Sequence, residues 1–287
     1  FRNVQLAMQL SAHAVRLDGK DPSARLSATM SAVSGVIAMS ATLEPVDFFM
    51  RVLGFDPERC DAVRVESPFP PGNRLVVVAR WIDTRYRRRE TSYPMVADLV
   101  RKLAASRAAN IMVFVPSYDY ARRLAEYLEG GSEIIMEQPG SGDRAKREII
   151  ERLADGERGP VIVVAVAGGS LAEGVDYPGR MCEGVVVVGP ALPRVDAERK
   201  LISDYYDEAG LDGFAYAYTY PGMIRVVQSA GRLIRAAGDR GVLVLADRRF
   251  GLAQYKRLMP PEWLDSLEEP DPEEFPRVVR AFWDRAV

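Results

Sequence analysis

Five short runs of apolar residues, separated by stretches with helical periodicity, constrain the fold of this chain more than any other feature. Within each run the apolar residues are continuous rather than alternating, which is typical of parallel strands covered on both faces. Regular alternation of such strands with helices predicts an α/β fold with a doubly wound, mainly parallel sheet and helices on both faces. The predicted strands are Leu75–Ala79, Ile111–Val115, Val161–Val166, Val185–Val188 and Val242–Leu245. The predicted helices are Tyr93–Ser106, Tyr118–Leu128, Asp143–Leu153, Asp196–Ala209 and Met223–Ala237.

The remainder of the chain is less regular and indicates where domains begin and end. Glu66–Asn73 holds three prolines and a glycine, a composition typical of an interdomain linker. We therefore predict three parts: a first domain tail over 1–66, a main domain over 67–264, and an acidic linker with a final helix over 265–287. The smaller elements predicted are the end of a helix over 1–12, a buried strand over Val33–Met39, a helix over Pro45–Leu53 and a helix over Phe275–Arg285.

Composition excludes several classes of function. The net charge of −2 gives no global basic field, so any nucleic-acid binding must use a local groove. Cys60 and Cys182 form no CxxC pair and His13 is the only histidine, so we expect no metal site or cysteine-ligated cluster in this chain. No run of about 18 apolar residues exists, so no membrane span is expected. The start at Phe1 has no signal-like pattern, and we expect an excised fragment from a reducing, intracellular compartment.

The stretch from Gln228 to Gly241 combines polar and apolar residues in a pattern that suggests phosphate binding. On a helix at about 100° per residue, Gln228, Gly231, Arg232 and Arg235 share one face, and the opposite side is apolar. Arginine forks match phosphate oxygens bidentately, so two arginines on one anchored helix are candidate phosphate sensors. The alternative is a solvated helix face with ordinary surface arginines.

The loops after the predicted strands carry the other candidate residues, because ligands of parallel sheets sit beyond the carboxyl ends of the strands. After Val161–Val166 come glycines that allow close backbone approach and carboxylates that suit a ribose hydroxyl, or else a Gly-rich turn with solvated acids. No sequence matches GxGxxG or GxxxxGK[ST], so a P-loop is absent. After Ile111–Val115, the Ser117 hydroxyl could bind a phosphate and the Tyr118 ring could stack on a base. The alternative is that Ser117 caps the N-terminus of a helix and Tyr118 packs nearby. The most basic patch, Arg80 with Arg85 and Arg87–Arg89, is a solvated loop or a DNA contact.

The order of these motifs resembles the XPD/DinG family of superfamily-two DNA helicases over roughly residues 20–264. The segments that carry the resemblance are DPSARL (21–26), MSATL (39–43), SPFPPGN (67–73), FVPSY (114–118), GGSLAEGVD (168–176), QSAGRLIR (228–235), LADRRF (245–250) and LMPPEWL (258–264). The sequence departs from the family mildly at Ala41, and the effect of Gly169 on a DNA contact is left open.

The resemblance implies a motor of two RecA-like domains, with ATP in their cleft and single-stranded DNA across their top. The expected ATP and Mg²⁺ would be bound mainly by a first domain absent from this sequence, which usually also carries an iron–sulfur cluster. The resemblance implies roles for the following residues: Arg232 and Arg235 as arginine fingers with Gln228; Glu173, Gly174, Asp176 and Gly231 beside the nucleotide; Ser40 and Thr42 in coupling; Ser117, Tyr118, Gly168 and Ser170 toward DNA.

The predicted function is thus the second motor domain of a 5′ to 3′ ATP-dependent DNA helicase, which would be inactive without its first domain. Its expected partners are single-stranded DNA and helicase domain 1 of the same polypeptide, in the cytoplasm or nucleus, and a regulatory protein partner stays open. The alternatives are a noncatalytic RecA-like module that binds a partner protein, or a related motor acting on RNA or in a CRISPR system.

Overall fold

The computed structural model describes residues 5–11, 14–107, 109–128, 131–172, 177 and 179–285, with side chains from residue 19 onward. The chain forms two compact units, which are described separately. The first unit combines Phe1–Glu66 with Leu192–Ile224, and the second combines Ser67–Ala191 with Arg225–Val287. The sequence placed residues 192–224 within the main domain, whereas in the structure they pack with the N-terminal segment.

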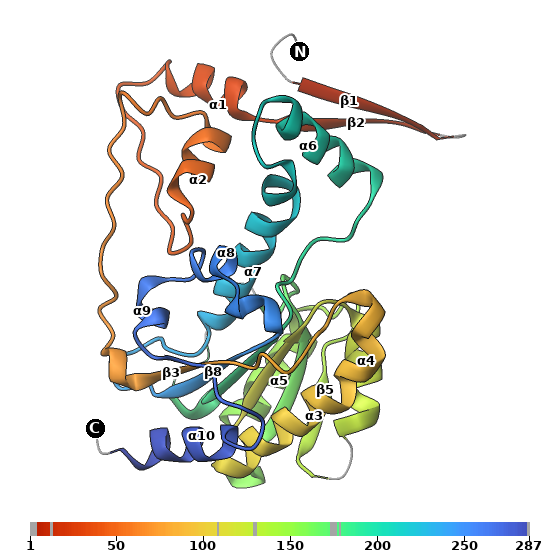
Figure 1. The fold of residues 1–287 in the computed structure, drawn as a ribbon, viewed down its shortest axis with the longest axis vertical. Helices are drawn as coiled ribbons and strands as arrows, with labels where there is room; N and C mark the ends of the chain where they lie inside the picture. Colours follow the sequence, from red (N-terminus) through yellow and green to blue (C-terminus); the bar gives the residue numbers. More distant parts are fainter. Residues whose placement is uncertain are drawn as a thin grey trace. The chain divides into compact units, whose positions relative to one another are not determined.

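The second unit is built on a parallel sheet of seven strands in the order β5-β6-β4-β7-β8-β3-β9. Figure 1 labels β3, β5 and β8 of this sheet. Every neighbouring pair in this sheet is parallel, so the predicted α/β fold with a parallel sheet is confirmed. The strands are β3 (Arg74–Val78), β4 (Ile111–Val115), β5 (Glu133–Met136), β6 (Val161–Val166), β7 (Gly184–Val188), β8 (Gly241–Ala246) and β9 (Leu267–Glu268). All residues of β4, β7 and β8 are buried, as continuous apolar runs predict.

Helices complete the core on the faces of this sheet. Residues from α3, α4 and α10 join alternate residues of the strands in one large apolar cluster. The bounds of the longer helices are α3 (Arg89–Ser106), α4 (Tyr118–Leu128), α5 (Asp143–Ala154) and α10 (Phe275–Asp284). Short helical segments follow β8, namely Arg248–Gly251, α8 (Ala253–Lys256) and α9 (Pro261–Leu264).

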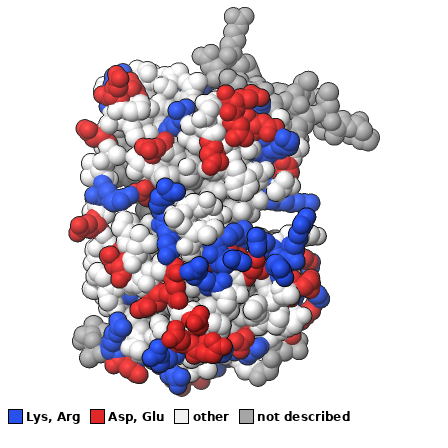
Figure 2. Space-filling model, in the orientation of Figure 1, with Lys and Arg blue, Asp and Glu red and all other residues white. Residues whose placement is uncertain are grey.

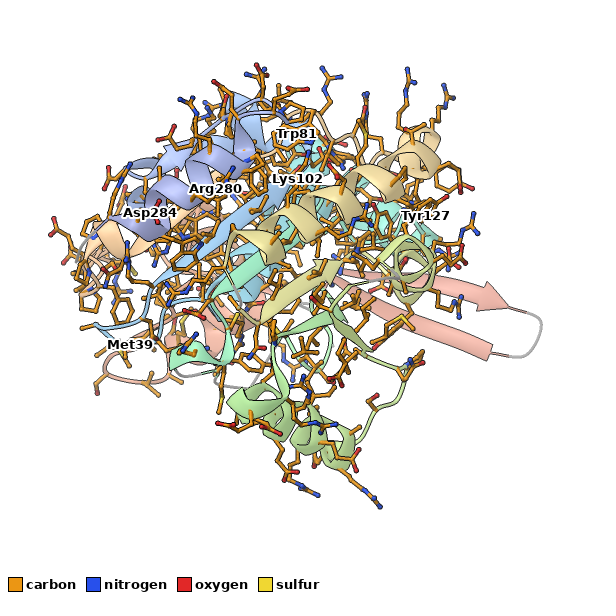
Figure 3. The ribbon with its side chains drawn as sticks, turned by 90° about the horizontal axis from the view of Figure 1, so that it is seen from below. Met39, Trp81, Lys102, Tyr127, Arg280 and Asp284 are labelled. Atoms are coloured by element: carbon orange, nitrogen blue, oxygen red, sulfur yellow. The ribbon has the colours of Figure 1, made fainter. Side chains whose placement is uncertain are left out.

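The C-terminal residues belong to this core rather than to a separate tail. Strand β9 pairs with β3, and the Phe275 ring lies 6.1 Å from the Trp81 ring. In Figure 3 helices α10, with Arg280 and Asp284, and α3, with Lys102, lie side by side, and they pack against each other. The prediction of an acidic linker and helix outside the main domain is therefore wrong, because the buried face of α10 covers the sheet.

The first unit contains an antiparallel ribbon and several helices. Strands β1 (Gln5–Ser11) and β2 (Ala14–Asp21) pair with each other, so the predicted helix end over residues 1–12 is wrong. The helices are α1 (Ser23–Met30), α2 (Val46–Leu53), α6 (Ala197–Glu208), a π-helical stretch at Ala215–Thr219, and α7 (Tyr220–Ala230), which continues into the second unit.

The helical core of this unit is aromatic. The Phe48 ring of α2 lies 5.2 Å from the ring of Tyr216 and 5.0 Å from that of Tyr220. Helix α2 ends at Gly54, whose φ of 74° favours glycine. A Cβ there would lie 2.2 Å from the Ser23 carbonyl oxygen, so this helix end packs directly on the start of α1.

Val33–Met39 does not form the predicted buried strand. Ile37 and Met39 (labelled in Figure 3) are 85% and 87% exposed, and the segment has no regular structure. An apolar run becomes a buried strand only where other strands pair with it and helices cover it, and the described part of this unit supplies neither. Among the described residues, no helix is long and apolar enough to cross a membrane.

Candidate functional site

The carboxyl edge of the parallel sheet gathers several of the loops that the sequence singled out. Because neighbouring strands run in the same direction, the segments after β4, β6 and β8 all leave the sheet at this edge. These segments begin at Pro116, Ala167 and Asp247. The Ala167 amide donates to the Val115 carbonyl at 2.9 Å, which fixes the first two loops against each other.

The loop after β6 is a tight turn that depends on its glycines. The Gly169 amide donates to the Val166 carbonyl at 2.8 Å, and the Ala172 amide donates to the Gly169 carbonyl at 3.1 Å. Gly168 has a φ of 77°, which is strained for residues with a side chain. A Cβ at Gly168 would also come within 3.2 Å of the Arg225 side chain.

Glu137, which sequence analysis missed, fixes this loop through hydrogen bonds to its carboxylate. Its carboxylate is almost fully buried, at 3% exposure. Oε2 accepts from the Val166 amide at 2.9 Å, and Oε1 accepts from the Ser170 hydroxyl at 2.7 Å and the Leu171 amide at 3.3 Å. Buried carboxylates are tolerated where donors surround them, so Glu137 acts as the organising acceptor of the loop.

The tightness of this arrangement explains Gly169. A Cβ at this position would lie 2.8 Å from Glu137 Oε2 and 2.8 Å from the Val166 carbonyl oxygen. Any side chain would therefore displace the Glu137 carboxylate or the backbone of β6. Glycine at this position therefore serves the loop's own packing.

The structure gives local partners to the residues predicted to contact DNA. The Ser170 hydroxyl is bound to Glu137, and the Ser117 hydroxyl accepts from the Tyr120 amide at 3.2 Å, as in an N-cap of α4. Tyr118 is half-buried close to Glu137. Burial first, and then the negative charge of Glu137, raise the pKa of the Tyr118 phenol above its usual range.

The predicted shared helical face of Gln228, Gly231, Arg232 and Arg235 does not form, because α7 ends at Ala230. The physical reason is Gly231, a poor helix former, after which the Leu233 amide donates to the Ala230 carbonyl at 3.1 Å, an i→i−3 bond.

The chain then folds into a turn around Asp239. The Asp239 carboxylate accepts from the backbone amides of Arg235 and Ala236, each at 2.8 Å. The Asn73 side-chain amide donates to the Ala237 carbonyl at 2.8 Å, which anchors the turn to the start of β3. The predicted helix over Met223–Ala237 is thus wrong at its C-terminal end.

The two arginines of this turn have different environments. Arg232 is buried, and its Nε and Nη2 both donate to the Ala172 carbonyl, at 3.0 and 2.6 Å. Arg235 is exposed. The structure therefore connects Arg232 to the loop after β6, whereas Arg235 lies at the surface.

The other predicted site residues are half-buried, exposed, in the first unit, or outside what the structure describes. Gln228 is half-buried near the end of α7 and Gly231 is exposed. In the first unit, the Ser40 and Thr42 hydroxyl oxygens lie 3.1 Å apart. Glu173, Gly174 and Asp176 lie outside the described residues.

A second buried carboxylate that sequence analysis missed, Asp247, fixes the loops after β3 and β8. It is fully buried and accepts from the Thr84 hydroxyl at 2.5 Å, the Thr84 amide at 2.9 Å, and the Arg249 Nε at 2.8 Å. Burial would raise the pKa of Asp247, but hydrogen bonds and charge from Arg249 and the Thr84 hydroxyl hold it below its usual value. Gly189, with a φ of 74°, leaves room for this cluster, since a Cβ there would lie 2.6 Å from Thr84 Oγ1.

Comparison with known proteins decides which family this arrangement represents. A family model described as "Helicase C-terminal domain" matches residues 100–266, which is more than half of the chain. The chain belongs to the helicase C-terminal domain family. The prediction of a helicase C-terminal domain of the XPD/DinG type is confirmed.

Curated relatives are longer than this chain. It is similar to "Probable ATP-dependent helicase MJ0942" of Methanocaldococcus jannaschii, with 26% identity over 75% of this chain and 34% of that protein. It is also similar to "ATP-dependent DNA helicase XPD" of Sulfolobus acidocaldarius, with 23% identity over 77% of this chain and 40% of that protein. The chain thus spans less than half the length of either relative.

Solved structures support the fold. A structure named "XPD_Helicase" superposes with a TM-score of 0.69 at 19% identity, over 92% of this chain and 48% of that one. Another, "XPD_APO", gives a TM-score of 0.68 at 21% identity, over 93% of this chain and 54% of that one. The predicted RecA-like fold of this helicase C-terminal domain is therefore confirmed.

Proposed function

We propose that this helicase C-terminal domain is the second motor domain of an ATP-dependent DNA helicase that moves 5′ to 3′ along one strand. The observation that carries the proposal is the pair of hydrogen bonds from the Arg232 guanidinium to the Ala172 carbonyl, at 3.0 and 2.6 Å. These bonds tie the loop expected to meet nucleic acid to the turn expected to meet nucleotide. A motor needs such a link, because binding of nucleotide must change the affinity for nucleic acid, and binding of nucleic acid must change the affinity for nucleotide.

In this proposal the two arginines divide the work. Arg235, which is exposed, meets the terminal phosphate as the arginine finger, because phosphoryl transfer develops charge on oxygens that a fixed guanidinium stabilises. Arg232 makes at most a minor contact with the nucleotide, and its main role is to hold the turn against the loop after β6. Gln228 orients the water or the triphosphate from the end of α7. Glu173, Gly174, Asp176 and Gly231 are the further residues proposed on the nucleotide side.

The nucleotide and its metal would be held mainly by another domain. Among the described residues there is no group of three or more His, Cys, Asp or Glu that could hold a metal ion. This chain's donors toward a triphosphate are guanidinium and amide groups, which suit phosphate oxygens. ATP, when bound, supplies the phosphoryl transfer that drives movement. We therefore assign Mg²⁺ and the phosphate-binding loop to helicase domain 1 of the same polypeptide.

The nucleic-acid side uses the loops after β4 and β6. Ser117, Tyr118, Gly168 and Ser170 border the proposed DNA groove, and Glu137 sets the shape of its glycine-rich part. Ser40 and Thr42 of the first unit are proposed to couple nucleotide state to the grip on DNA. Names of relatives that include "ATP-dependent DNA helicase" support a DNA strand as the substrate.

The test is Arg235→Ala in the full-length enzyme. Loss of an arginine finger should lower ATP turnover at saturating single-stranded DNA by about 10³- to 10⁵-fold, with DNA binding nearly intact. The matched control is Arg144→Ala, since Arg144 is an exposed arginine on α5, with a side chain 88% exposed. A folded Arg235→Ala enzyme that keeps more than about a tenth of the turnover would refute the finger role. Unwinding of substrates with 5′ or 3′ tails tests the polarity separately.

A further inference from the structure

A groove between the first turns of α3 and α4 is distinct from the loops proposed above. Its volume is about 590 Å³, and the residues that line it are Tyr86, Arg89, Glu90, Tyr93, Asp119 and Arg123. Tyr86 stands at its edge, and 82% of this residue is exposed. A side chain this exposed buries little apolar area and contributes little to folding, so most of its surface is accessible from the solvent.

Cations and rings alternate in this groove. The Arg89 guanidinium carbon lies 5.6 Å from the centre of the Tyr86 ring and 5.7 Å from that of the Tyr120 ring. The Arg123 guanidinium carbon lies 5.9 Å from the Tyr93 ring. These distances are those of cation–π contacts, and layers of this kind can be extended by another flat ring.

The lining of the groove holds two arginines and two carboxylates, and the exposed arginines that add positive charge lie just beside it. Its carboxylates have partners, since Glu90 pairs with Arg123 at 3.2 Å and Asp119 pairs with Arg122 at 3.1 Å. Asp83, just before the groove, pairs with Arg85 at 2.5 Å.

Three neighbouring arginines have no acidic partner among the residues that the structure describes. Arg87 and Arg88 are exposed and, like Arg89, form no ion pair within the described part of the chain. The Arg89 Nε atom is buried and has no hydrogen-bond partner among the described residues, which is costly for folding alone. Figure 2 shows Lys and Arg side chains gathered in the middle of the visible face, over the stretch that connects β3 with α3.

Hydrogen bonds hold the segments that support the groove in place. Asp247 fixes the backbone amide of Thr84, two residues before Tyr86. The Ser92 and Tyr120 hydroxyl oxygens lie 2.8 Å apart and join the first turns of α3 and α4. A preformed platform lowers the entropic cost of binding an extended, flexible ligand.

From this geometry we propose that the groove binds single-stranded nucleic acid, with one base stacked on Tyr86 and adjacent phosphates on Arg87 and Arg88. A π-face next to unpaired guanidinium groups is the chemistry that sequence-independent single-strand binding uses. The proposal rests on the proposed function and extends the path of the strand beyond the loops after β4 and β6, along the N-terminal end of α4.

The experiment is a fluorescence anisotropy titration of a labelled oligothymidine with this chain at low salt. Tyr86→Ala should weaken binding by about 5- to 150-fold, the range for loss of one stacked base, whereas Tyr86→Trp should bind at least as tightly as the wild type. The double variant Arg87→Ala/Arg88→Ala should lower the slope of log K against log[salt] by about 1.4. The matched controls are Tyr127→Ala on α4, a tyrosine that is 39% exposed, and Arg144→Ala/Arg147→Ala on α5.

The outcomes separate this inference from the proposed function. If the wild-type chain binds and Tyr86→Ala binds within twofold of it, at an unchanged melting temperature, the inference is overturned and the helicase proposal stands. If neither this chain nor the full-length enzyme binds any single strand, the proposed function itself fails. Photocrosslinking of an iodouracil oligonucleotide to the peptide that contains Tyr86 would support the stacking directly, and crosslinks confined to other peptides would contradict it.

Discussion

Replacing Glu137 by glutamine tests whether one buried carboxylate organises the loop after β6. The substitution keeps the shape of the side chain and leaves no cavity. It changes only what the side chain offers: the carboxylate accepts from the Val166 amide, the Leu171 amide and the Ser170 hydroxyl, and all three are donors. A glutamine amide must place an N–H group in front of at least one of them.

The magnitude follows from the two orientations of that amide. With nitrogen at the Oε2 position, the Val166 amide loses its acceptor at 2.9 Å. With nitrogen at Oε1, the Leu171 amide loses its acceptor, although the Ser170 hydroxyl can rotate and accept. Either orientation leaves one buried backbone donor unpaired and removes the charge from the remaining bonds. The free energy of unfolding should fall by about 2–3 kcal/mol.

The assay is a melting curve followed by circular dichroism, with the anisotropy titration alongside. A loss of that size corresponds to a melting temperature about 4–12 °C lower for a chain of this size. Glu148→Gln on α5 is the control, since its side chain is 60% exposed in a pair with Arg144, and it should change stability by about 0.5 kcal/mol or less. A Glu137→Gln protein that melts within about 1 °C of the wild type would refute the reasoning.

Two further predictions concern the other buried polar groups. The pKa of Asp247 is lowered in the folded state, so its contribution to stability is present above the unfolded pKa of about 3.9 and is lost as the pH falls further through the folded value. Urea unfolding at several pH values should therefore show a steeper acid loss for the wild type than for Asp247→Asn, and parallel curves would contradict this. Arg232→Ala should cost about 2–4 kcal/mol because it removes a buried guanidinium bonded twice to the Ala172 carbonyl, whereas Arg235→Ala at an exposed position should cost about 0.5 kcal/mol or less. Equal losses in thermal melts would contradict the different environments of the two arginines.

The central strands could be predicted because they are buried on both faces. The sequence placed Ile111–Val115 and Val161–Val166 at their observed bounds, since a continuous apolar run leaves little choice of end. Strand β5 was missed because it has only four residues, begins with exposed Glu133, and leaves its other residues half-buried. Val33–Met39 failed for the opposite reason: its apolar run looks like a core strand, but burial depends on partners that the run itself does not encode.

For the candidate site, the sequence singled out residue types, but it did not predict the contacts among them. Gly168 and Gly169 stood out because glycines after a strand let the backbone approach a ligand closely. Arg232 stood out because a guanidinium group can bind phosphate oxygens with two hydrogen bonds. Glu137 did not, because its role arises only when β5 pairs with β6 and brings position 137 beside position 166. The sequence did contain one signal for Glu137, namely a carboxylate directly after an apolar stretch. Asp247 stands in the same position, directly after the apolar run that ends at Ala246.

Gly231 changes how the arginine motif must be understood. A continuous helix would present Arg232 and Arg235 on one face and make them interchangeable sensors. Because α7 ends at Ala230, the turn instead sends Arg232 inward to the Ala172 carbonyl and keeps Arg235 exposed. The same turn is held at its far end by Asp239 and by Asn73 on the Ala237 carbonyl. Under the proposed function, a displacement of Arg235 by bound nucleotide is therefore transmitted along this hydrogen-bonded turn to Arg232. Arg232 passes it to the loop after β6 through the Ala172 carbonyl, which couples nucleotide binding to DNA binding.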